Sequence, residues 1–81
     1  MSLESEIREH LVRCLAGENS LQAFVEWFSA RTWDVEASGE PAAEDLTADI
    51  ELRLAEYTNG HWTEKELRSL LTQRIQTYEV V

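Results

Sequence analysis

The feature that most constrains the fold of this sequence is the spacing of its apolar residues, which recur every three or four positions in four separate stretches. In the first stretch they stand at Leu3, Ile7, Leu11 and Leu15, positions that lie on one side of an α-helix. No stretch shows the strict alternation of apolar and polar residues expected of a half-buried β-strand. The sequence therefore predicts an all-α fold.

Helix stop and start signals separate the four stretches. Gly17 and Gly60 suit C-terminal caps, because glycine adopts the left-handed conformation at little cost. Asn19 or Ser20 can cap the second helix, and Pro41 fits the first position of the third helix after a longer connection. The predicted helices cover residues 3–16, 20–31, 41–58 and 63–79.

The start of the fourth helix carries two signals together. Thr63 and Glu66 have the spacing of a capping box, in which each side chain accepts a hydrogen bond from the other's backbone N–H. Trp62 and Leu67 are placed for a hydrophobic staple across that box. The fourth helix is therefore predicted to begin at about Thr63.

The length of 81 residues allows one domain with a single core. Two αα-hairpins, each with one apolar face, can bury those faces against each other, which predicts a compact antiparallel four-helix bundle spanning residues 1–81. A shift of 43 positions places Leu3 on Leu46 and Gly17 on Gly60. This correspondence reflects either an internal duplication or the common pattern of any two helical hairpins.

The charge of the chain is the main guide to its function. Sixteen acidic and seven basic residues give a net charge of −9, which repels nucleic-acid phosphates and favours a basic protein partner. Residues 34–56 hold eight of the acidic residues and only one basic residue, Arg53. Most of the excess negative charge is therefore local.

The predicted third helix places its carboxylates around an outward leucine. At 100° per residue, Asp45, Asp49 and Glu56 fall on one side of the buried stripe, and Leu52 lies near the middle of the outward face. An apolar anchor inside a charged rim is typical of a binding patch; the alternative is a solvated helix face with one exposed leucine. The predicted partner-binding residues are Trp33, Asp34, Glu36, Asp45, Asp49, Leu52 and Glu56.

No group of residues predicts catalysis, a metal or a cofactor. His10 and Cys14 are four positions apart on one predicted helix, but no second pair at ligand spacing completes a zinc site. His61 stands in a turn, where a solvated imidazole is the usual reading. No nucleophile is accompanied by a base and an orienting group, so we expect a binding protein and not an enzyme.

The compartment is inferred from what the sequence lacks. The single cysteine cannot form an intramolecular disulfide, the first residues lack the basic and apolar regions of a signal peptide, and no apolar stretch reaches the ~18–20 residues of a membrane span. We therefore expect a cytoplasmic protein without membrane contact.

Two parts of the chain resemble the colicin D-type immunity proteins, a bacterial self-protection family. In residues 11–33, the run Cys14-Leu15-Ala16-Gly17-Glu18-Asn19-Ser20 leads into Phe24 and Phe28 and is similar to the first hairpin of that family. Residues 59–71, from Asn59-Gly60 through Glu66-Leu67-Arg68-Ser69-Leu70-Leu71, resemble its last helix. Residues 35–48 match no part of the family, so no contact residue is carried over there.

The resemblance implies a small four-helix bundle that binds a tRNA-cleaving toxin and blocks its basic substrate site with acidic side chains. The charge distribution agrees with this implication, because it favours a basic protein partner. Together they lead us to expect a stoichiometric inhibitor of a nuclease toxin. The alternative is a helical adaptor or regulatory subunit of a larger complex, in which the apolar end Tyr78-Glu79-Val80-Val81 seals a contact or a homodimer. The sequence leaves the oligomeric state open.

Overall fold

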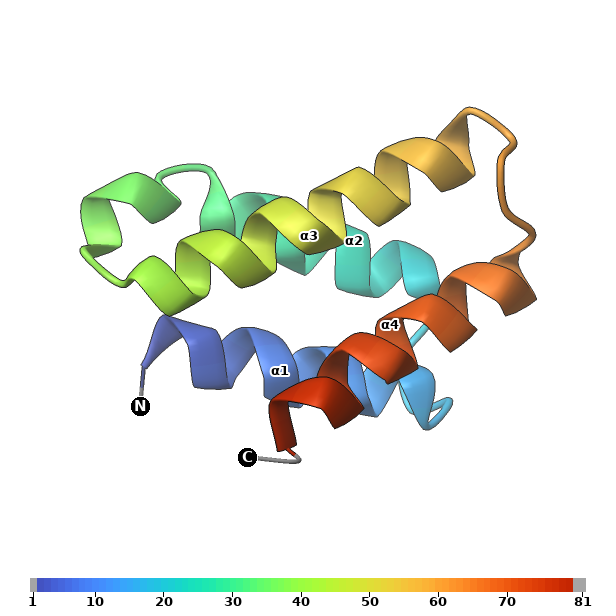
Figure 1. Cartoon of the computed structure of the whole chain (residues 1–81), viewed down its shortest axis with the longest axis horizontal. Helices are drawn as coiled ribbons and strands as arrows, with labels where there is room; N and C mark the ends of the chain where they lie inside the picture. Colours follow the sequence, from blue (N-terminus) through green and yellow to red (C-terminus); the bar gives the residue numbers. More distant parts are fainter. Residues whose placement is uncertain (1, 80–81) are drawn as a thin grey trace. The chain divides into compact units, whose positions relative to one another are not determined.

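The chain forms four α-helices and one short 3-10 helix in the computed structural model, which describes the backbone of residues 2–79 and the side chains of residues 2–75 (Figure 1). Within this described part there is no β-strand, and the predicted all-α fold with four helices is confirmed. The elements in chain order are α1 (Leu3–Leu15), α2 (Leu21–Thr32), η1 (Val35–Ser38), α3 (Pro41–Thr58) and α4 (Glu64–Glu79).

The turn after α1 is closed by a Schellman motif around Gly17. The Gly17 N–H donates to the Cys14 carbonyl at 3.0 Å, and the Glu18 N–H donates to the Arg13 carbonyl at 3.0 Å. Gly17 has φ +86°, a left-handed conformation that costs glycine little. Ser20 then caps α2 by accepting a hydrogen bond from the Ala23 N–H at 3.0 Å, as one of the two predicted caps.

The turn after α3 repeats this geometry. The Gly60 N–H donates to the Tyr57 carbonyl at 3.0 Å, and the His61 N–H donates to the Glu56 carbonyl at 2.9 Å. The capping box at the start of α4 is confirmed, since the Glu66 N–H donates to Thr63 Oγ1 at 3.1 Å and the Thr63 N–H donates to Glu66 Oε1 at 3.0 Å.

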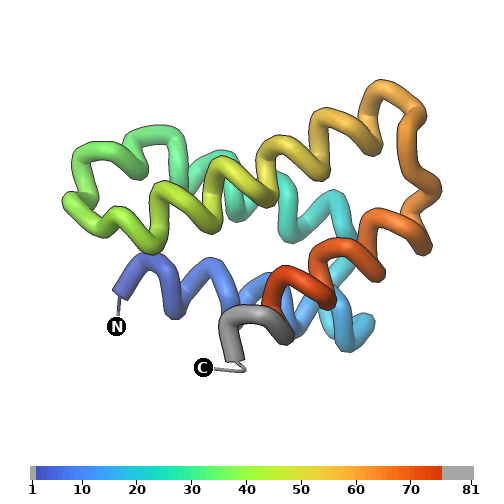
Figure 2. Tube along the Cα trace, in the orientation of Figure 1, coloured from blue at the N-terminus to red at the C-terminus, as the bar shows by residue number. Residues whose placement is uncertain are grey.

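The chain divides into two compact units, of which the first extends to Thr47. Here α1 and α2 lie side by side and run in opposite directions, as the Cα trace shows (Figure 2). Their buried residues include Ile7 and Leu11 on α1 and Phe24 and Phe28 on α2. At one edge of this hairpin, Arg31 on α2 forms an ion pair of 2.7 Å with Glu6 on α1.

The second unit begins at Ala48 and contains the rest of α3 and α4. Among its residues up to 75, those buried are Ile50, Leu67, Leu71 and Ile75. Arg74 on α4 forms an ion pair of 2.7 Å with Asp49 on α3. This contact links α3 to α4 within the second unit.

The two hairpins correspond in more than their apolar spacing. The same shift of 43 positions that relates the glycines also relates the ion pair between Glu6 and Arg31 to that between Asp49 and Arg74. The two Schellman turns are related by this shift as well. These shared contacts support the internal duplication, which stays a hypothesis.

The connection between α2 and α3 contains one element that the sequence analysis did not predict. Residues 35–38 form the 3-10 helix η1, closed by Gly39 with φ +69°. The Ser38 hydroxyl donates to the Val35 carbonyl at 2.6 Å. A single turn of this length is too short to produce a periodic apolar pattern, which explains why the sequence read as an irregular connection.

None of the helices in residues 2–79 combines the length and the apolar character needed to cross a membrane. The apolar end proposed for the adaptor reading, Tyr78 to Val81, lies outside the residues whose side chains are described.

Candidate protein-binding site

The segment after α2 presents an indole beside free carboxylates. Trp33 is the C-terminal cap of α2, and 81% of its surface is exposed. Asp34 and Glu36 follow on the exposed surface, and neither side chain forms an ion pair or hydrogen bond with a residue in the described range 2–75. Their negative charges are therefore available to a partner.

The carboxylates of α3 fall into two groups. Asp45 is exposed and has no ion-pair partner among the described side chains. Asp49, four residues further along the helix, is only partly exposed and receives the guanidinium of Arg74 at 2.7 Å. Much of the Asp49 charge is therefore neutralised within the second unit.

Glu56 is also engaged inside the second unit. Its Oε1 atom accepts hydrogen bonds from the Trp62 indole N–H at 3.1 Å and from Arg53 at 2.9 Å. These contacts lower the pKa of Glu56, the Trp62 hydrogen bond contributing most and the Arg53 hydrogen bond next, because both stabilise the charged carboxylate. The hydrogen bond from Trp62 also links the turn that precedes α4 to the end of α3.

Leu52 lies on the outward side of α3, as predicted, with 53% of its surface exposed. Ala48 and Ala55, one turn before and one turn after it, are exposed as well. The small side chains around Leu52 leave a shallow apolar surface, and Glu51 beside Leu52 is exposed. A partner could contact this surface with apolar side chains and place a basic group near Glu51.

The structure separates the predicted site residues by their availability. Trp33, Asp34 and Glu36 are exposed in a stretch of four residues in which Val35 is half-buried, and we call these three exposed residues the Trp33 segment. Asp45 and Leu52 are exposed on α3. Asp49 and Glu56, also predicted to bind a partner, both form intramolecular contacts.

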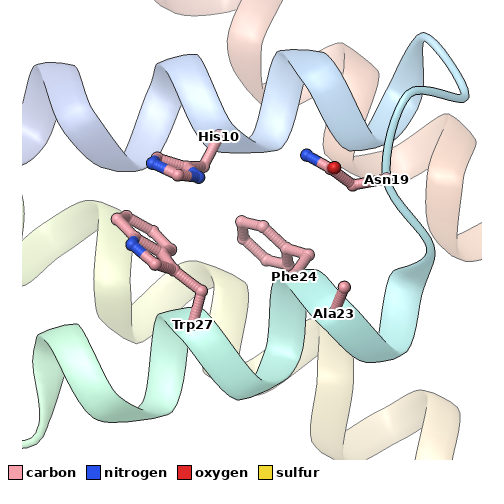
Figure 3. A pocket seen from close by; sticks show the side chains of 5 residues that line it. All are labelled: His10, Asn19, Ala23, Phe24 and Trp27. Carbon is pink, nitrogen blue, oxygen red and sulfur yellow. The ribbon is translucent and has the colours of Figure 1, made fainter.

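A pocket between α1 and α2 was not predicted from the sequence. It has a volume of about 210 Å³, and its lining side chains approach one another from the two helices and from the turn between them (Figure 3). The lining residues are His10, Asn19, Ala23, Phe24 and Trp27. The sequence signal was the large aromatic Trp27 on the flank of the apolar stripe of α2.

His10 and Cys14, the pair weighed as metal ligands, both lie in packed surroundings. The His10 imidazole stacks on the Trp27 indole, with ring centroids 3.7 Å apart and planes at 15°, and Cys14 is 1% exposed. No group of three or more metal-ligating side chains occurs within the described part of the chain. Aromatic stacking therefore explains the position of His10, and burial in the core explains that of Cys14.

Comparison with known proteins adds no relative to this description. No protein-family model matches the chain, and neither curated proteins nor solved structures yield a match. The similarity to colicin D-type immunity proteins therefore stays a prediction based on the residues quoted above.

Proposed function

We propose that this protein is a stoichiometric inhibitor of the immunity type, which covers the basic active site of a tRNA-cleaving nuclease toxin. The observation that supports this most is the Trp33 segment, in which an indole that is 81% exposed stands next to two carboxylates without counter-ions among the described residues. A large exposed aromatic beside unpaired charge is typical of an interface anchor with an electrostatic rim.

The mechanism follows from the charge of the two partners. A nuclease must present basic side chains to the phosphates of its substrate, and Asp34, Glu36 and Asp45 offer carboxylates to those same side chains. The net charge of −9 accelerates the encounter, and the Trp33 indole supplies apolar area that slows dissociation. Inhibition is by occlusion, needs no cofactor, and takes place in the cytoplasm, where tRNA is the target.

The proposal predicts that a neighbouring gene encodes a toxin with a basic nuclease domain, and it is tested by tRNA cleavage with that domain. One equivalent of the protein should abolish cleavage. The double variant Asp34→Lys, Glu36→Lys should restore it, whereas Glu18→Lys, Glu26→Lys should inhibit like the natural chain. The control pair is matched, because Glu18 and Glu26 are also exposed in the first unit and have no ion-pair partner among residues 2–75. Equal inhibition by both double variants would contradict the proposal.

A second candidate, a helical adaptor, is favoured by the exposed surface of α3. Ala48, Leu52 and Ala55 form a shallow apolar stripe on which a partner helix can pack closely. For an adaptor, Leu52→Asp should abolish assembly with its complex while the Trp33 segment variants leave assembly unchanged. The inhibitor predicts the larger loss from the Trp33 segment.

A further inference from the structure

We propose that the pocket between α1 and α2 binds one uncharged aromatic side chain, a tyrosine or a tryptophan, of the protein partner. This inference rests on the proposed function in one respect, since the side chain belongs to the same partner that the Trp33 segment recognises. The pocket and the Trp33 segment both lie within the first unit. They would act as two separate recognition elements, one for an aromatic ring and one for basic groups.

The chemistry of the lining selects an uncharged group. The pocket is lined by an imidazole, a carboxamide, a methyl group, a phenyl ring and an indole, with no carboxylate, ammonium or guanidinium among them. A lysine or arginine side chain entering it would lose hydration, and cation–π attraction to Phe24 and Trp27 would offset only part of that cost because no carboxylate lines the pocket. The basic groups of the partner are therefore directed to the Trp33 segment and not to this pocket.

The arrangement of the rings favours a flat group. The Phe24 and Trp27 rings have centroids 6.3 Å apart and planes inclined by 38°, and Figure 3 shows them on the same side of α2 with the His10 ring over Trp27. Rings at such distances attract one another through edge-to-face and offset contacts. A further aromatic ring can extend this cluster mainly through the half-buried Trp27, because Phe24 is only 3% exposed. A branched aliphatic side chain makes dispersion contacts with the same ring but no ring–ring contact.

Three polar groups at the pocket can pair with a ligand that has a hydrogen-bonding edge. The His10 ring nitrogens, the Asn19 carboxamide and the Trp27 indole N–H have no hydrogen-bond partner among residues 2–75. Asn19 is exposed and His10 and Trp27 are half-buried, so a ligand would replace water at these groups. The carboxamide can donate and accept, and the imidazole does both when neutral. A phenol O–H or an indole N–H offers the complementary group, which a phenylalanine ring lacks.

The volume agrees with a single side chain as the occupant. Pockets for drug-sized molecules measure ~300–1,000 Å³, and this one measures about 210 Å³. The pocket is thus too small for a large cofactor and large enough for one ring. Aromatic anchors of a partner commonly fill pockets of this kind at the centre of an interface.

The test uses side-chain probes and needs no partner. N-acetyl-tyrosinamide and N-acetyl-tryptophanamide are titrated into the ¹⁵N-labelled protein, and the Trp27 indole N–H resonance is followed, with those of Trp33 and Trp62 as internal references. A ligand of this size should bind with a dissociation constant on the order of 1–10 mM. N-acetyl-leucinamide and N-acetyl-argininamide should bind at least about tenfold more weakly.

Two variants locate the binding to the pocket. Ala23→Leu places a larger side chain in the lining and should weaken probe binding at least about tenfold. Ala30→Leu is the matched control, because Ala30 is also exposed on α2 but does not line the pocket. Asn19→Ala removes the carboxamide without touching the Ser20 cap and should weaken binding several-fold, which keeps the test decisive if Ala23→Leu disturbs the fold.

The outcomes separate this inference from the proposed function. The absence of a saturable Trp27 shift, equal shifts with the leucine or arginine probe, or equal losses in Ala23→Leu and Ala30→Leu would each overturn the pocket proposal. None of these results would affect inhibition through the Trp33 segment. Conversely, the double variant Asp34→Lys, Glu36→Lys should bind the aromatic probes like the natural chain. This result is expected whether or not the same variant loses inhibition in the tRNA cleavage assay.

Discussion

Removing the Thr63 hydroxyl should destabilise the protein by about 1 kcal/mol, because it deletes half of the capping box at the start of α4. In the natural chain Thr63 Oγ1 accepts from the Glu66 N–H at 3.1 Å, while Glu66 Oε1 accepts from the Thr63 N–H at 3.0 Å. Thr63→Ala breaks only the first of these bonds. Both residues are exposed, so water can solvate the freed amide, which keeps the loss below the ~2 kcal/mol seen for the costliest caps.

The assay is urea unfolding followed by circular dichroism, with thermal unfolding beside it. A loss of about 1 kcal/mol in a chain of this size corresponds to a decrease in Tm of about 4–8 °C. Thr58→Ala is the control, because the Thr58 hydroxyl bonds to the Leu54 carbonyl within α3 at 3.0 Å and caps no helix start. Its change should stay within about 0.5 kcal/mol. Equal midpoints for the two variants would refute the assignment of the cap.

The remaining predictions concern buried and titrating groups. Thr47 is 2% exposed and its hydroxyl oxygen has no partner among the described residues, so Thr47→Val should raise the free energy of unfolding by about 1 kcal/mol in urea melts; a loss of stability would show that the hydroxyl is satisfied. The folded state lowers the pKa of Glu56 below its ordinary value of 4.5. The charged Glu56 side chain therefore adds to the free energy of unfolding above pH 4.5, and this stabilisation is lost as the pH falls through the folded-state pKa. Glu56→Gln should therefore be less stable than the natural chain at pH 7, and the difference should shrink in melts at lower pH; a constant difference would contradict the linkage.

Much of the helical framework could be predicted because its signals are local. The start of α3 at Pro41 and its end at Thr58 agree with the prediction, and the other predicted helix ends fall within one residue of the structure. Glycine caps, the capping box and apolar spacing all act within one or two helical turns. The element that escaped, η1, is a single turn without apolar periodicity.

The availability of the site residues could not be predicted in the same way. Asp49 forms an ion pair with Arg74, which is distant in sequence and contacts Asp49 only in the folded hairpin. The contact between Arg53 and Glu56 could be expected from the sequence, because residues three positions apart are neighbours on a helix. The hydrogen bond from Trp62 to Glu56 could not, because it depends on the path of the turn. The pocket likewise requires α1 and α2 to lie side by side, so no single stretch of sequence contains it.

The most direct test of the central claim is the association rate with the nuclease domain that a neighbouring gene is expected to encode, measured by stopped-flow fluorescence across a range of salt concentrations. If the free carboxylates of the Trp33 segment steer the encounter, the rate should fall about tenfold or more between low and high salt. Asp34→Lys, Glu36→Lys should then associate at least about tenfold more slowly than Glu18→Lys, Glu26→Lys at low salt. Both double variants change the net charge equally, so the comparison isolates position. Equal rates for the two folded variants would contradict the account and show that the Trp33 segment is ordinary solvated surface.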